Sequence, residues 1–179
     1  MRTTSIIVAL LITLAAAGCQ RPIEPTVDGS WKFVPEKSTD LATWRYRLPQ
    51  LSIDSTDAPV RILLSWMERS RAAFVDTFFV DPGGETREVT IYSRLWPANW
   101  YMGVLAIEHS TRTMHGSWTD RPRGLDFTSE QPVSISQGET PLTTHWELRV
   151  DPETGFLTLR EQRSSRPTPI VMVFERLED

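Results

Sequence analysis

The chain has 179 residues and a formal net charge of −4, with 40% hydrophobic residues, 23% charged residues and a single cysteine. This length is ample for one domain with a sizeable core, and a slightly acidic chain without a basic stripe argues against a nucleic-acid partner. One cysteine excludes an internal disulfide and zinc sites built from several cysteines. We therefore expect a single domain, stabilised by packing, with no metal and no cofactor.

The first 18 residues have the layout of a secretory signal peptide. Arg2 supplies a positive charge, an apolar run covers residues 6–14, and four small residues precede Cys19. A helix over the apolar and small residues would reach only about 20 Å, whereas the hydrocarbon core of a bilayer measures about 30 Å. The segment is therefore expected to be a signal peptide, residues 1–18, and not a membrane span.

The sequence LAAAGCQ, residues 14–20, resembles the lipobox of bacterial lipoproteins. The resemblance implies that Cys19 is acylated, with palmitate or a similar fatty acid, and becomes the new N-terminus. Several acyl chains anchor a protein firmly in a membrane, since each buried methylene contributes about 0.8 kcal/mol to the binding free energy. Gln20 stands where an aspartate would retain such a lipoprotein at the inner membrane, so the resemblance implies an outer-membrane anchor with the domain in the periplasm. The alternative is a soluble export signal with an unmodified Cys19.

Residues 19–28 are predicted to be the lipidated N-terminus and an extended tether, because they hold two prolines and no hydrophobic period. The domain is predicted to cover residues 29–179. Its sequence consists largely of short runs in which apolar and polar residues alternate, as in strands with one buried face. These runs are LSID (51–54), residues 60–66, AFVDTFFV (73–80), REVTIYS (87–93), WYMGVLAIEH (100–109), TMHGSWT (113–119), GLDFT (124–128), PVSIS (132–136), residues 142–150, FLTLREQ (156–162) and PIVMVFER (169–176).

The number and spacing of these runs predict an all-β fold, an antiparallel barrel or sandwich of about 8–10 strands. Little helix is expected, with one short segment near residues 38–44. The turn DPETG, residues 151–155, predicts a hairpin, because Pro152 suits an early turn position and Gly155 tolerates positive φ. Two further hairpins are predicted, one across DPGG (81–84) and one between WYMGVLAIEH and TMHGSWT.

Both ends of the domain resemble small bacterial lipocalin-like proteins. The similar segments are DGSWKFVPEKS, residues 28–38, and RVDPETGFLTLREQRSSRP followed by VMVFER at the C-terminus. They cover about a third of the domain. The resemblance implies a closed up-and-down β-barrel in which Trp31 plugs the base and Arg176 stacks on it.

Aromatic residues mark the predicted binding region. The chain has seven tryptophans, and aromatic-lined cavities bind small apolar ligands, although large aromatic residues also fill narrow barrels. In RLWPANWY, residues 94–101, Trp96 and Trp100 flank Pro97 in a predicted loop. We therefore expect Trp96 and Trp100 to contact a ligand or a partner at the barrel mouth, with core packing as the alternative.

No motif specifies a reaction. The sequence has no nucleophile elbow, phosphate loop or His-Glu-x-x-His motif. The segment EQRSSRP, residues 161–167, is interpreted either as a solvated hairpin tip or as a binding site for an anionic head group. The other titratable residues of note are scattered and predict neither a metal site nor an activated carboxylate pair: His109, His115, His145, Asp76, Glu88, Glu108 and Glu147.

These observations favour a non-enzymatic protein. The leading hypothesis is a membrane-anchored periplasmic lipocalin-like module that binds a small hydrophobic or amphipathic ligand, or docks an envelope protein. The alternative is a periplasmic enzyme or enzyme inhibitor on the same barrel, because a fold alone does not fix function. The sequence does not identify the ligand or partner, the oligomeric state, or whether the barrel interior is hollow.

Overall fold

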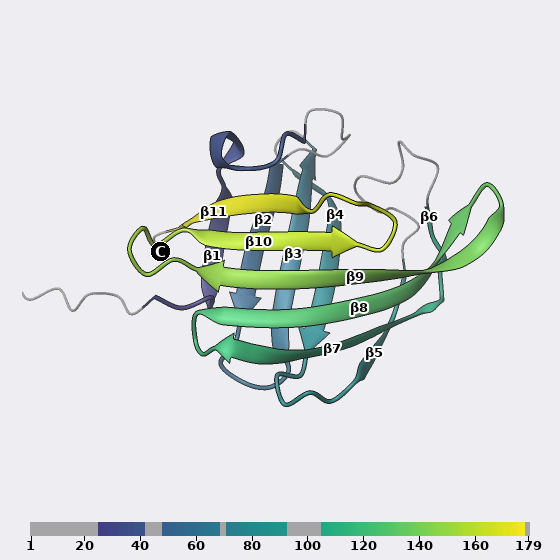
Figure 1. Cartoon of the computed structure of the whole chain (residues 1–179), viewed down its shortest axis with the longest axis horizontal. Coiled ribbons are helices and arrows are strands. Elements are labelled where there is room, and N and C mark those ends of the chain that lie inside the picture. The colour runs from purple at the N-terminus through teal and green to yellow at the C-terminus, as the bar shows by residue number, and fades with distance from the viewer. Residues whose placement is uncertain (1–24, 42–47, 69–70, 93–104, 178–179) are drawn as a thin grey trace, which may run out of the picture.

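The computed structural model of the chain describes residues 25–41, 48–68, 71–92 and 105–177. Its described part is almost entirely antiparallel β-structure, which confirms the predicted fold class (Figure 1). The elements are β1 (Gly29–Phe33), the 3₁₀ turn η2 (Pro35–Lys37), β2 (Leu48–Asp54), β3 (Val60–Glu68), β4 (Arg71–Val80), β5 (Arg87–Thr90), β6 (Leu105–Ala106), β7 (Thr111–Asp120), β8 (Gly124–Ile135), β9 (Gly138–Val150), β10 (Leu157–Arg163) and β11 (Ile170–Arg176). Within the described ranges, no helix has the length and apolar character needed to cross a membrane.

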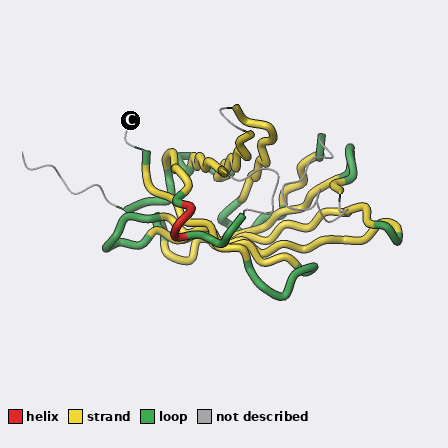
Figure 2. Tube along the Cα trace, turned by 90° about the horizontal axis from the view of Figure 1, so that it is seen from above, coloured by secondary structure: helices red, strands yellow, loops and turns green. Residues whose placement is uncertain are grey.

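The strands form one up-and-down sheet that curls into a nearly closed barrel. Their order is β4-β3-β2-β1-β11-β10-β9-β8-β7-β5, and β6 pairs with β8. The first and last strands are neighbours, with Trp31 opposite Arg176. In Figure 1, β2 to β4 make the back wall and run steeply across β7 to β11 in front. Figure 2 shows the same strands from above, with the helical turn η2 toward one end.

The barrel closes incompletely between β4 and β5, and we call this gap the seam. One isolated bridge, Gly83 to Ser117, joins the turn after β4 to β7. At that point β4 and β7 approach closely, because a Cβ added at Gly116 would lie 2.5 Å from Val80 Cγ1. Away from this contact, β5 pairs with β7 and not with β4. The seam therefore leaves the facing edges of β4 and β5 without a shared ladder.

Two predicted hairpins are wrong, and both errors concern the strands around the seam. The DPGG turn does form, since Asp81 accepts a hydrogen bond from the Gly83 N–H at 2.9 Å and pairs with Arg87 at 3.1 Å. The chain then pairs with β7 instead of returning along β4. The second wrong prediction is the hairpin between WYMGVLAIEH and TMHGSWT. The strand β6 lies in the first of these segments and pairs with β8 at Val133 and Ser134. It does not pair with β7, because both edges of β7 are already occupied by β5 and β8.

The C-terminal half matches the sequence pattern more closely. In β9, Leu142, Trp146 and Leu148 are buried while His145 is exposed, and β9 and β10 form the predicted hairpin. GLDFT and PVSIS, expected as separate strands, are joined in the single strand β8, which runs without interruption along β9. The predicted helix near residues 38–44 is replaced by η2 at residues 35–37, while residues 42–47 lie outside the described part.

The packed domain begins before Gly29. Val27 is fully buried in the main core, its N–H donates to the Pro122 carbonyl at 2.9 Å, and its carbonyl accepts from Trp31 Nε1 at 2.9 Å. Residues 19–28 were expected to form a tether with no packed side chain. The structure corrects this boundary, because the end of that segment is part of the fold.

Candidate functional site

One end of the barrel, here called the base, is filled by Trp31. Its side chain is 1% exposed, and the Arg176 guanidinium lies 4.5 Å from the centre of the ring. Arg176 also donates from Nη2 to the Thr26 carbonyl at 2.6 Å, which ties the N-terminal segment to the last strand. This is the arrangement that the lipocalin resemblance implied for Trp31 and Arg176. Trp31 therefore fills the barrel interior at this end, and an open pocket of about 280 Å³ lies beside it, lined also by Val150 and Phe156.

Three predicted site residues cannot be placed. Cys19, Trp96 and Trp100 lie outside the described residues. The predictions of lipid attachment at Cys19 and of ligand or partner contact by the two tryptophans therefore stay predictions.

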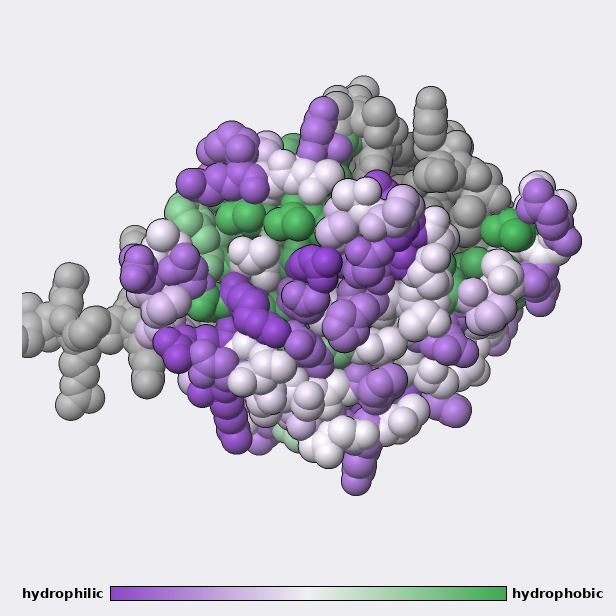
Figure 3. All heavy atoms as spheres, viewed as in Figure 1, coloured by the Kyte–Doolittle hydropathy of each residue, from purple (hydrophilic) through white to green (hydrophobic). Residues whose placement is uncertain are grey.

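The scattered titratable residues do not converge on one site. His109, His115 and His145 are exposed, and His145 Nδ1 lies 3.1 Å from Thr128 Oγ1. In the described ranges, no three side chains of the metal-binding types form a group. Glu147 pairs with Arg160 at 2.6 Å on the outer face of β9 and β10, which belongs to the largely hydrophilic surface in Figure 3.

A layer of buried polar residues crosses the barrel interior away from the base. It separates the main apolar core from a small apolar cluster around Val133 and Leu142, and Phe74 packs against both. The layer comprises Asp76, Arg112, Ser129, Gln131, Thr144, Glu161 and Arg163. Because buried charges are stable only when paired and hydrogen-bonded, such a layer must be built from complementary groups.

Glu161 and Arg163 form the first charged pair of this layer. They occupy inward positions of β10, continuing the alternation of Leu157 and Leu159, and Arg163 Nε donates to Glu161 Oε1. Burial raises the pKa of the Glu161 carboxyl, and the neighbouring Arg163 only partly offsets that rise. The prediction of a solvated hairpin tip is therefore wrong for both residues, which point into the barrel.

The second pair joins the two sides of the seam. Arg112 of β7 donates from Nη1 to Asp76 Oδ1 of β4 at 2.5 Å and from Nε to Gln131 Oε1 of β8 at 2.6 Å. The side chains of Asp76 and Arg112 are 7% and 8% exposed, and the guanidinium lies 5.1 Å from the centre of the Phe78 ring. Asp76, expected to be one of several scattered carboxylates, is therefore part of the barrel interior.

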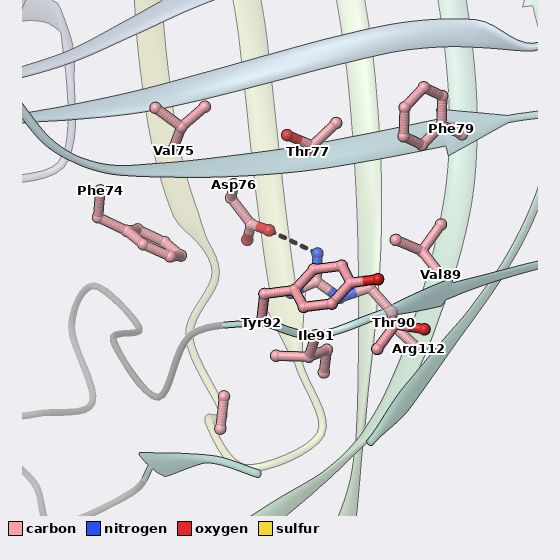
Figure 4. A pocket seen from close by; sticks show the side chains of 11 residues that line it. Phe74, Val75, Asp76, Thr77, Phe79, Val89, Thr90, Ile91, Tyr92 and Arg112 are labelled. Atoms are coloured by element: carbon pink, nitrogen blue, oxygen red, sulfur yellow. Dashed lines mark hydrogen bonds and ion pairs between the residues drawn. The ribbon is translucent and has the colours of Figure 1, made fainter. Parts of the chain in front are cut away.

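A pocket of about 300 Å³ opens along the seam beside this pair, and we call it the seam pocket (Figure 4). It exists because β4 and β5 do not pair, so that side chains from both faces of β4 border it. In Figure 4, Phe74 and Asp76 project to one side of β4, and Val75, Thr77 and Phe79 to the other. The remaining lining residues are Val89, Thr90, Ile91, Tyr92, Ala106 and Arg112.

The lining combines apolar walls with a small polar part. Six of its side chains are apolar, three carry hydroxyl groups, and the charged residues are Asp76 and Arg112. Val75 and Tyr92 are 44% and 75% exposed, so apolar surface continues to the pocket rim. Among the described lining residues, Asp76 is the one carboxylate, and there is no histidine or cysteine.

Sequence reasoning missed the seam pocket, although a signal for it is present. In AFVDTFFV, Asp76 stands in the same alternating register as the buried Phe78 and Val80, and in β7 Arg112 shares a register with the buried Met114. A charged residue of each sign on an apolar face indicates a buried pair. The contact between Asp76 of β4 and Arg112 of β7 could not be inferred, because it depends on how the strands around the seam pair.

Comparisons with known proteins add no identity. No protein-family model matches the sequence, and no curated protein matches it.

Proposed function

We propose that this protein is a lipid-anchored envelope module that binds a small amphipathic molecule in the seam pocket. The observation that carries the proposal is the combination of apolar walls with the buried Asp76–Arg112 pair in one pocket of about 300 Å³. Small-molecule sites range from about 300 to 1,000 Å³ and are mostly apolar with a few polar groups. The size of the pocket favours a compact or short-chain ligand.

The proposed anchor is consistent with the position of the pocket. Acylation of Cys19 and a periplasmic location rest on the resemblance of LAAAGCQ to a lipobox. The described chain enters the domain at the base, where Val27 and Trp31 pack. A membrane tether attached there would not occupy the seam between β4 and β5.

Native mass spectrometry of the mature chain, residues 19–179 with Cys19→Ser, tests the proposal. This variant keeps every described residue and needs no detergent. The expected result is a bound small molecule after gentle purification, or saturable binding of added 1-decanol as a probe.

Thr77→Trp supplies the pocket-blocking variant, because Thr77 lines the seam pocket. Thr158→Trp is its control, since Thr158 is also half-buried but lies on β10. The proposal predicts that Thr77→Trp loses the bound molecule and that Thr158→Trp keeps it. Equal occupancy in both variants, or no binding in the parent chain, would contradict it.

Partner docking is the second proposal, and the exposed Val75 and Tyr92 at the seam favour it. Docking on this surface predicts that no small molecule binds the parent chain and that Val75→Ser with Tyr92→Ser abolishes co-purification of a cross-linked envelope protein. A cross-linked partner that survives the double variant would contradict it.

A further inference from the structure

We infer that the seam pocket selects a neutral amphiphile, one with a hydroxyl-type head, over anionic or cationic amphiphiles of the same chain length. This inference rests on the proposed function and names the class of ligand for that same pocket.

The charges of the seam pocket are balanced. The pocket lining has one positive group, Arg112, and one negative group, Asp76, and they already neutralise each other at 2.5 Å. A ligand carboxylate would have to compete with Asp76 for Arg112, which would leave one of the two carboxylates without a counter-ion. A ligand ammonium would have to compete with Arg112 for Asp76. Separating a buried ion pair is strongly unfavourable, because it leaves an uncompensated charge at low dielectric.

Arg112 already directs its hydrogen-bond donors at protein acceptors. Arg112 directs Nε to Gln131 and Nη1 to Asp76, and its guanidinium also lies over the Phe78 ring. The bidentate fork that usually recognises a carboxylate is therefore divided between two protein acceptors. A ligand anion would have to break at least one of these contacts to gain a bidentate one.

The surroundings of the Asp76–Arg112 pair hold a second charged pair. The other charged pair of the polar layer, Glu161 with Arg163, is also balanced within the barrel. Glu161 lies near enough to Asp76 for the Asp76 charge to contribute to the raised pKa of Glu161. The region therefore holds two carboxylates and two guanidinium groups in pairs, so it gives neither an added anion nor an added cation a counter-ion that is not already engaged. Neutral hydroxyl groups face the pocket instead, on Thr77, Thr90 and Tyr92 (Figure 4).

The experiment compares three probes of equal chain length: 1-decanol, decanoate and decylammonium. Isothermal titration calorimetry of the mature Cys19→Ser chain at neutral pH, below the aggregation concentration of each probe, measures their affinities. We expect 1-decanol to bind at least about tenfold more tightly than either charged probe. A tenfold difference in affinity corresponds to less free energy than the cost of leaving a buried charge unpaired. Equal affinities, or a charged probe that binds best, would overturn the inference.

Two variants should shift the order toward one of the charged probes. Asp76→Asn leaves Arg112 without its counter-ion, so decanoate should gain about tenfold or more in affinity. Arg112→Gln leaves Asp76 without its counter-ion, so decylammonium should gain instead. Glu88→Gln is the matched control, because it removes a carboxylate from the exposed side of β5 and should leave the order unchanged. A decanoate gain in Glu88→Gln as large as in Asp76→Asn would contradict a local effect.

The outcomes separate the inference from the proposed function. If all three probes bind the parent chain but show no order, and Thr77→Trp abolishes their binding, the pocket stands and the inference fails. If none binds, the proposed function fails as well. Thermal melts establish that each variant is folded, and the order of the three probes on the parent chain decides the matter even if neither charge variant folds.

Discussion

At the scale of single residues, Trp31 shows how one side chain closes the base of the barrel. It is almost fully buried, donates to the Val27 carbonyl and carries the Arg176 guanidinium on its face. Truncation of a large buried aromatic residue typically costs about 3 to 5 kcal/mol in unfolding free energy. Trp31→Ala should lower the unfolding free energy by that amount in a denaturant titration.

Lys32→Ala is the control for this prediction. Lys32 is next in sequence, but it forms an exposed pair with Glu175, and such pairs contribute roughly 0 to 1 kcal/mol. A Trp31→Ala variant that unfolds at the same denaturant concentration as Lys32→Ala would show that the base does not depend on this tryptophan.

At the scale of elements, the turn between β9 and β10 gives a pH-dependent prediction. The N–H groups of Glu153 and Thr154 donate to Asp151 Oδ1 at 2.8 and 3.1 Å and hold the Asp151 pKa below its ordinary value of 3.8. A lowered pKa in the folded state means that ionised Asp151 favours folding. Its contribution is present above pH 3.8 and is lost as the pH falls through the folded-state pKa.

Asp151→Ala should therefore reduce the unfolding free energy at neutral pH, and its difference from the parent should shrink as the pH falls below 3.8. Urea titrations across this pH range measure the difference. Thr158→Val, which changes a neutral residue of β10 outside this turn, should differ from the parent by an amount that does not change with pH. A difference for Asp151→Ala that does not change with pH would contradict this account of the turn.

Local sequence determines some elements of the barrel and leaves others open. The alternation over residues 142–150 and the DPETG turn predict the hairpin of β9 and β10, because both its strands and its turn are encoded locally. The pairing of β5 with β7 and of β6 with β8 could not be predicted, since alternation does not say which sheet edge is free. The seam pocket depends on those pairings. The sequence therefore places charged residues at Asp76 and Arg112 but does not indicate that they form an ion pair.

At the scale of the whole molecule, the proposed anchor predicts where the protein resides. Cys19→Ser should abolish labelling by a fatty-acid analogue and release the protein from the membrane fraction, because without acyl chains no buried methylenes oppose its release. Ser30→Ala serves as the control, since it alters a domain residue and should leave both labelling and fractionation unchanged. Equal labelling of Cys19→Ser and the parent would rule out acylation at this residue.

Methyl chemical-shift mapping shows directly whether a small amphiphile occupies the seam pocket. The mature Cys19→Ser chain, labelled at isoleucine and valine methyls, would be titrated with 1-decanol. We expect saturable shifts at Val75, Val89 and Ile91, which line the pocket, and unchanged methyl signals at Val150, which is buried in the core and does not line it. Saturable shifts at Val150 with Val89 and Ile91 unmoved, or no saturable shift at all, would contradict this expectation.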